Sequence, residues 1–207
     1  AVSFYAPDSD SVVNINDGSC TFSVATDKKV WSDWERGVYH DAPWVAIVLG
    51  EEEVVVNHVS LGFIDEHASN DPNVAAGNKV RLPAAYVIQY YTGDYENLDF
   101  NASQVNNGRN WPVMNGSEHW QTVAVIRQDE IPSSAEFDQM LHTYFEPVKT
   151  TAIRVVMTPQ ENQWVGIDEL EIYGLTATPG STVSVEDILL DGKSVMNQFD
   201  DQNRMTL

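Results

Sequence analysis

The sequence has a single cysteine, Cys20, and no apolar run long enough to span a membrane. One cysteine cannot form an intramolecular disulfide, so stability must come from a hydrophobic core or from a bound metal ion. Spanning a bilayer takes about 20 apolar residues, and Ala1 does not open a signal peptide. We therefore expect a piece of a longer secreted protein whose export signal lies elsewhere.

Basic residues are also scarce. The 207 residues include 11 Lys and Arg against 31 Asp and Glu, which gives a net charge of −20 and a pI of about 4.3. Binding to nucleic acid or to anionic lipid requires a basic surface. The composition therefore excludes both as expected partners, and it suits the binding of cations.

Motifs for catalysis are missing as well. Cys20 lies in DGSCTF without a basic neighbour, and there is no GxSxG sequence for a serine nucleophile. The five histidines show no HExxH or other metal-binding spacing. With so many Asp and Glu residues, the sequence does not exclude a hydrolase that uses a pair of carboxylates, but no pattern singles out such a pair. We expect no catalytic centre.

What the sequence does contain is a series of short runs rich in β-branched and aromatic residues, several of them alternating between apolar and polar positions. The runs are 45–50, 53–64, 84–93, 120–126, 150–159 and 166–175. Residues 133–145 contain the best candidate for a short helix. Regularly spaced strands with few helices predict an all-β fold, an antiparallel sandwich or jelly roll.

Loops and a linker divide these runs. The insertions at 65–79 and 93–110 are too long for plain hairpins, and loops of that length often carry function. The Thr/Pro/Gly segment 176–182 marks a boundary. We expect one domain over 1–175. The β-rich tail, 176–207, is a linker followed either by the start of an Ig-like repeat cut at Leu207, which we prefer, or by strands that pack back on the sandwich.

Two tryptophans, Trp31 and Trp34, lie in a polar loop before the first long strand. The ordinary role for such residues is to cap the end of a sandwich, and we expect that role for Trp31. The alternative is a sugar-stacking ring: the C–H face of a pyranose packs on an indole, and charged neighbours bind the hydroxyls. For this site we predict Trp34, Arg36, Asp65, Glu66, His67 and Trp164.

The segment NINDG, residues 14–18, offers Asp17 beside a glycine turn. Carboxylate and carbonyl oxygens are the ligands that Ca²⁺ prefers. An ordinary Asx-Gly turn between strands is the other interpretation.

Taken in order, the motifs resemble the galactose-binding-like, or factor V/VIII type C (discoidin), superfamily. They are NINDG, VWSDW, APWVAIVLG, VNHVSLGFIDEH, RLPAAYVIQYYTG, HWQTVAVI, TTAIRVVMTP and WVGIDELEIYG. The WxxWxR and LPxxYxxQYYTG patterns are similar to carbohydrate-binding modules attached to secreted bacterial glycoside hydrolases, β-galactosidases in particular. The resemblance covers roughly residues 8–175.

The resemblance implies a five-on-three jelly roll with its ligand in the loops at one end, and a structural Ca²⁺ held by Asp17 and Glu169. The residues between Asp17-Gly18 and Trp31 form a longer loop than the family has, so its other ligands stay open, with Thr26 and Asp27 as candidates. It also implies a non-catalytic, monomeric module that binds galactose or galactose-containing glycans. The parent chain would be a bacterial, secreted or wall-attached glycoside hydrolase with linked catalytic and Ig-like domains.

Two other functions remain open at this stage. A discoidin-like adhesion module would bind a host protein or cell surface, since the acidic chain is unsuited to anionic lipid. A structural spacer would bind nothing and would present no tryptophan to solvent.

Overall fold

The computed structural model describes residues 15–18, 20, 30–34, 37–66, 79–98, 119–132 and 140–174, and the backbone of 189–190 and 193–194. Two compact units make up the chain, Ala1–Gly174 and Leu175–Leu207. No α-helix occurs among the described residues, and none of their helices has the length and hydrophobicity to cross a bilayer.

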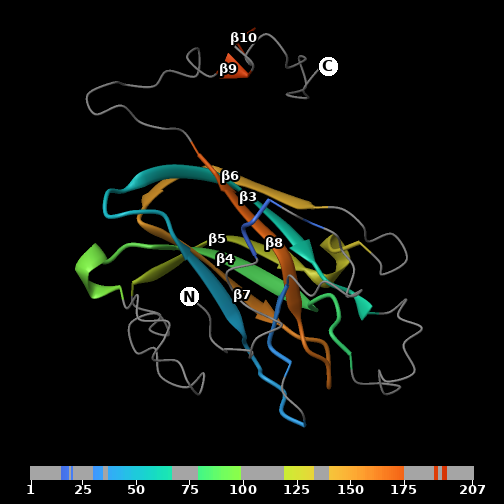
Figure 1. Ribbon diagram of the computed structural model, residues 1–207. Helices are drawn as coiled ribbons and strands as arrows, with labels where there is room; N and C mark the ends of the chain where they lie inside the picture. The colour runs from blue at the N-terminus through green and yellow to red at the C-terminus, as the bar shows by residue number, and fades with distance from the viewer. Residues whose placement is uncertain are drawn as a thin grey trace. The chain divides into compact units, whose positions relative to one another are not determined.

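The first unit is a sandwich of two four-stranded antiparallel sheets (Figure 1). One sheet has the order β1 (Trp31–Ser32), β8 (Gly166–Tyr173), β3 (Val54–Phe63) and β6 (Leu141–Thr150). The other has the order β2 (Trp44–Val48), β7 (Ala152–Thr158), β4 (Ala85–Tyr91) and β5 (Trp120–Arg127). Two 3₁₀ turns, η3 (Tyr95–Asn97) and η5 (Gln128–Glu130), complete the described elements.

This architecture confirms the predicted β-sandwich, with two corrections. The resemblance implied five strands on three, whereas the described residues form four on four. The helix predicted over 133–145 is wrong where it can be checked: Leu141–Thr150 is the edge strand β6, and 133–139 lie outside the described residues. Tertiary pairing decides the outcome, since β6 follows β3 for most of its length.

The core follows from the two-residue period of the strands. On β3, Val59, Leu61 and Phe63 point inward and are fully buried, while His58 and Ser60 lie on the outer face of the same sheet. Trp31 is also buried, in agreement with the packing role expected for it, and so is Trp44. The sequence therefore specifies which face of each sheet closes the core.

The outer face of the second sheet buries a cation. The Arg154 guanidinium lies over the Trp120 ring at 4.4 Å and donates from Nε and Nη2 to the Gln89 side-chain oxygen at 3.0 and 2.6 Å. Arg154 is almost fully buried. A planar guanidinium can stack on a ring and bond sideways at the same time, which explains an arginine at this position.

The second unit contains a short antiparallel pair, β9 (Leu189–Leu190) with β10 (Lys193–Ser194). In the sequence the two strands flank Asp191-Gly192, a dipeptide typical of hairpin turns, which lies outside the described residues. Their pairing agrees with the strand–turn–strand pattern of the sequence. The assignment of this unit to an Ig-like repeat stays a prediction.

Candidate functional site

The candidate site lies at the end of the sandwich where β1 and β3 end and β8 begins. Cα pairing places Trp31 and Phe63 on opposite sides of Ile167, so the three chain segments leave the sheet together. The loop that carries Trp34 and the turn that carries Asp65 therefore lie at the same end.

Aromatic side chains meet solvent at this end. Trp34 is 48% exposed and Tyr39 is 37% exposed, and Val38 is exposed between them. We call Trp34, Val38 and Tyr39 the aromatic rim. Beneath the rim lies Trp164, which is only 3% exposed.

Trp164 holds the rim in place. Its ring stacks on Tyr39 with centroids 4.9 Å apart, and it lies 6.1 Å from the Trp34 ring. Its indole Nε1–H donates to the Val38 carbonyl oxygen at 2.7 Å. The predicted contact residue Trp164 thus lies below the surface, where it supports the exposed rings and offers little face of its own.

Asp33 ties the rim loop to the sandwich. Its Oδ1 accepts from the Val165 backbone N–H at 2.7 Å, and its own N–H donates to the Val165 carbonyl oxygen at 3.1 Å. Its Oδ2 lies 3.4 Å from Nδ1 of His40. Burial raises the pKa of the Asp33 carboxyl, and the bonds to His40 and Val165 oppose that rise.

The predicted acidic turn adds charged groups. Asp65 forms an ion pair with Arg81, whose Nε lies 2.8 Å from the carboxylate Oδ1. The Arg81 backbone N–H donates to the Trp164 carbonyl oxygen at 2.8 Å. The ion pair is therefore fixed to the segment that carries the buried tryptophan.

Glu66 plays a different part. Its Oε2 accepts a hydrogen bond from the Val80 backbone N–H at 2.9 Å. The Glu66 backbone N–H in turn donates to the Val80 carbonyl oxygen at 3.0 Å. One carboxylate oxygen is thus used to close the turn. Arg36 and His67, the remaining predicted contacts, lie outside the described residues.

Sequence reasoning missed Tyr39 and Arg81. Tyr39 follows the WxxWxR segment after a glycine, Gly37, whose φ of 74° turns the chain back toward Trp164. Arg81 begins the RLPAAY motif just before β4. Their proximity to Trp34 and Asp65 depends on pairing across the sheet, which no local pattern reports.

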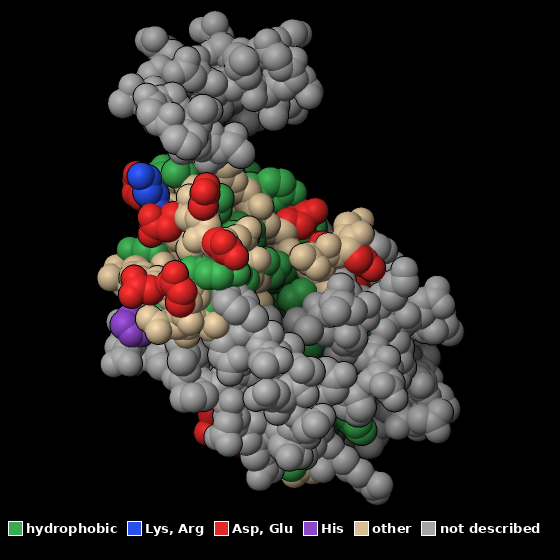
Figure 2. Space-filling model, turned by 60° about the vertical axis from the view of Figure 1, so that its left-hand side comes forward, with side chains coloured by type: hydrophobic (Ala, Val, Ile, Leu, Met, Phe, Trp, Pro, Cys, Tyr) green, Lys and Arg blue, Asp and Glu red, His purple; other side chains and the backbone are tan. Residues whose placement is uncertain are grey.

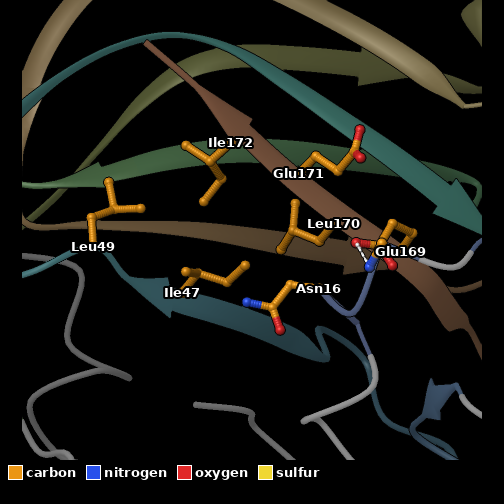
Figure 3. A pocket seen from close by; sticks show the side chains of 8 residues that line it. Asn16, Ile47, Leu49, Glu169, Leu170, Glu171 and Ile172 are labelled. Carbon is orange, nitrogen blue, oxygen red and sulfur yellow. Dashed lines mark hydrogen bonds between the residues drawn. The ribbon is translucent and has the colours of Figure 1, made fainter. Parts of the chain in front are cut away.

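The predicted metal residues lie at another place, where the turn that carries Asp17 contacts Glu169 on β8. The Gly18 backbone N–H donates to Glu169 Oε1 at 3.4 Å, and Leu170 N–H donates to the Ile15 carbonyl oxygen. Glu169 is buried, at 2% exposure, whereas Asp17 is exposed. Glu169 and Asn16 line a hollow of about 320 Å³ that also touches Ile47. Figure 3 shows these side chains around it.

Oxygen donors of this kind fit a hard cation: a buried carboxylate, an adjacent aspartate and turn carbonyls. The described residues hold no group of three or more His, Cys, Asp or Glu side chains placed round one metal ion. Backbone oxygens would have to complete the site, so Ca²⁺ stays a prediction. On the part of the surface that Figure 2 colours by residue type, acidic side chains outnumber basic ones.

Comparison with known proteins fits this geometry. The profile of a family described as "Beta-galactosidase-like, Galactose-binding domain" matches residues 3–171. A structure from a study of the Streptococcus pneumoniae β-galactosidase BgaA is 27% identical, with a TM-score of 0.63; the match covers 84% of this chain and 90% of that one. A search of curated proteins finds no match.

Two further structures share the fold. One is chitosan-binding module 1 of a Paenibacillus chitosanase/glucanase, at 18% identity and TM-score 0.50, covering 84% of this chain and 92% of that one. The other is CBM32-3 from a Clostridium perfringens family 31 glycoside hydrolase, at 15% identity and TM-score 0.50, covering 84% and 88%. With its sandwich and its family match over most of its length, the chain belongs to the β-galactosidase-like galactose-binding domain family and is a carbohydrate-binding module.

Proposed function

We propose that this module binds terminal galactose or galactose-containing glycans at the aromatic rim and holds an attached glycoside hydrolase close to its substrate. The family description and the resemblance to the BgaA structure support galactose and a β-galactosidase-like parent. On this proposal the parent is a secreted or wall-attached bacterial enzyme and the module itself acts as a monomer.

The observation that carries the proposal is the exposure of Trp34. The Trp34 ring is 48% exposed, so it gives up burial of apolar surface, and its centroid lies 6.1 Å from that of the buried Trp164 ring. An open ring face of this kind suits the C–H patch of a pyranose. The same exposure weighs against a spacer, which would present no tryptophan to solvent.

Hydroxyl recognition comes from the charged groups beside the rim. On this proposal the Arg81 guanidinium, which is 20% exposed and paired with Asp65, donates to sugar oxygens, and the carboxylate fixes its direction. Galactose carries an axial 4-hydroxyl that leaves C–H groups together on the opposite ring face. Stacking on the tryptophan ring, together with the N–H donors of the arginine, therefore distinguishes galactose from the epimer whose 4-hydroxyl is equatorial. Arg36 and His67 remain proposed partners on the same basis as in the sequence.

We also propose a structural Ca²⁺ beside Glu169. The Asn16–Gly18 turn lies against the buried carboxylate, so an ion would connect the turn to β8. Asp17 and Glu169 would supply carboxylate oxygens. The ion would stabilise the turn and take no part in sugar contact.

The module needs only weak affinity for this role. A shallow site buries little area, and sugar hydroxyls exchange bonds with water for bonds with protein at small net gain. Tethering raises the local concentration of an attached enzyme at its polymer, so modest binding suffices.

A glycan array tests the proposal. The chain is applied with Ca²⁺ and, separately, with a chelator, and galactose-terminated probes are compared with the same probes after β-galactosidase treatment. Binding should require terminal galactose. Equal binding to the treated, galactose-free probes would contradict galactose specificity and would indicate a module that recognises another sugar. Binding to mucin that persists after full deglycosylation would instead favour protein adhesion.

A further inference from the structure

Two histidines meet on the outer face of the first sheet, a part of the molecule that the proposed sugar site does not use. His58 lies on β3 and His142 on the edge strand β6. Cα pairing sets Tyr144 and Tyr173 opposite His58, and it sets His142 and Glu171 opposite Ser60. Two adjacent cross-strand rows thus carry the polar and aromatic side chains.

The nitrogen atoms of the two imidazoles are close. Nε2 of His58 lies 3.2 Å from Nδ1 of His142, and the ring centroids are 5.3 Å apart. The Ser60 hydroxyl oxygen lies 2.6 Å from Nδ1 of His142 and 3.2 Å from Nε2 of His58. Three donor atoms from two strands therefore converge, and His142 is exposed to solvent.

The His58 ring is held in its orientation by two tyrosines. Tyr144 stacks on it at 4.1 Å with planes 10° apart, and Tyr173 stacks at 4.7 Å with planes 13° apart. The stacking occupies both faces of the imidazole and leaves its edge directed at His142. Although Tyr144 is 72% exposed, rings that cover one another offer a poor platform for a sugar. The arrangement instead favours binding at the ring nitrogens.

We propose that His58 Nε2 and His142 Nδ1 together bind a divalent transition-metal ion, with Zn²⁺ as the probe. Two imidazoles on one tetrahedral Zn²⁺, at about 2.0–2.1 Å each, have nitrogens about 3.3–3.4 Å apart. The measured 3.2 Å requires only a small adjustment. Imidazole is a preferred ligand for Zn²⁺, Ni²⁺ and Cu²⁺ and a poor one for Ca²⁺, so this site differs in chemistry from the oxygen-lined turn at Glu169.

The surroundings are suited to a cation. Glu171 lies across β3 from His142, and its Oε2 accepts from the Tyr173 hydroxyl at 2.6 Å. A nearby carboxylate and a net charge of −20 attract a divalent ion. Among the described residues, no third His, Cys, Asp or Glu is placed to join the pair. Water and the Ser60 hydroxyl would fill the other positions, and the ion would be exchangeable.

The test is calorimetric titration of Zn²⁺ into the chelator-stripped chain, in a large excess of Ca²⁺ so that acidic groups are occupied. One Zn²⁺ should bind. His142→Ala should lower the affinity at least about tenfold, as should His58→Phe, which keeps a flat ring between the two tyrosines. His119→Gln, which changes a histidine on another part of the fold, should bind Zn²⁺ as the wild type does.

A second readout separates a lost ligand from a lost fold. Zn²⁺ should raise the melting temperature of the wild type and of His119→Gln, and it should leave that of His142→Ala unchanged. Galactose binding should be equal in all three. The proposal is overturned if the wild type binds no Zn²⁺ under these conditions, or if folded His142→Ala binds it with wild-type affinity. The pair would then be a hydrogen bond between imidazoles and nothing more.

Discussion

The ring of Trp34 stands in solvent with its centroid 6.1 Å from that of buried Trp164, and the two indole planes are inclined by 55°. One tryptophan thus gives the surface its apolar character, and the other fixes the loop below it. The Trp164 N–H that donates to the Val38 carbonyl is the polar link between this buried ring and the aromatic rim. The exposed ring of the rim and the support beneath it therefore come from different residues, and each can be tested by its own substitution.

Removing the polar link should loosen the rim. Trp164→Phe keeps an aromatic ring but leaves the Val38 carbonyl without its donor, which should lower the free energy of unfolding by about 1–3 kcal/mol. Denaturant unfolding measures this loss. The matched control, Trp34→Phe, changes an exposed ring and should unfold as the wild type does. Equal effects from the two variants would contradict the division of roles.

The pH dependence of stability should include a contribution from Asp33. Because burial raises the pKa of Asp33, the folded state binds this proton more tightly than the unfolded state does. Its contribution to the free energy of unfolding therefore falls as pH rises from the unfolded pKa, near 3.8, through the raised folded pKa. Asp33→Asn should remove this fall, so melting temperatures of the variant and the wild type should diverge over that interval.

His40 provides a second test of the pH dependence that Asp33 gives to stability. The interactions with His40 lower the pKa of Asp33, so His40→Gln should raise it further. The fall in stability should then extend to higher pH than in the wild type. Parallel profiles for wild type, His40→Gln and Asp33→Asn would show that Asp33 does not titrate in this range.

Arg154 should resist conservative replacement. Lysine cannot stack on Trp120 while donating twice to Gln89, so Arg154→Lys should lower the free energy of unfolding by about 1–3 kcal/mol. Arg127→Lys, on an exposed side chain at the end of β5, serves as the control and should change it by less than about 0.5 kcal/mol. Similar values for both would mean that charge alone matters at position 154.

Calcium should stabilise the module through Glu169. A ligand at 100 times its dissociation constant adds about 2.7 kcal/mol to the free energy of unfolding. The melting temperature of the wild type should therefore drop when a chelator replaces Ca²⁺, and that of Glu169→Gln should not. Glu171→Gln, two residues along the same strand, should keep the drop. A wild-type melting temperature that does not change when the chelator replaces Ca²⁺ would contradict the proposed calcium site.

The strands could be predicted because their alternation is local. The six predicted runs overlap β2, β3, β4, β5, β7 and β8, since β-branched and apolar residues repeat every second position. β6 was mistaken for helix over part of its length because LHTYFEPVKT has no continuous apolar face. It is an edge strand with alternating half-buried and exposed positions, and only its pairing with β3 identifies it.

The residues of the candidate site were harder to predict from the sequence than the strands. Trp34 could be singled out because a large apolar side chain stood in a polar loop, and Asp65 because it follows a strand end. Tyr39 and Arg81 could not, because each contacts Trp164, which lies 125 positions beyond Tyr39 and 83 positions beyond Arg81 in the chain. Burial of Trp164 likewise depends on those partners.

The most direct measurement is galactose binding by Trp34→Ala beside its melting temperature, taken by titration calorimetry with a galactose-terminated oligosaccharide. The account predicts at least about a tenfold loss of affinity, partial recovery in Trp34→Phe, and an unchanged melting temperature. Wild-type affinity in a folded Trp34→Ala protein would contradict it, because the exposed indole would then have no part in the sugar site.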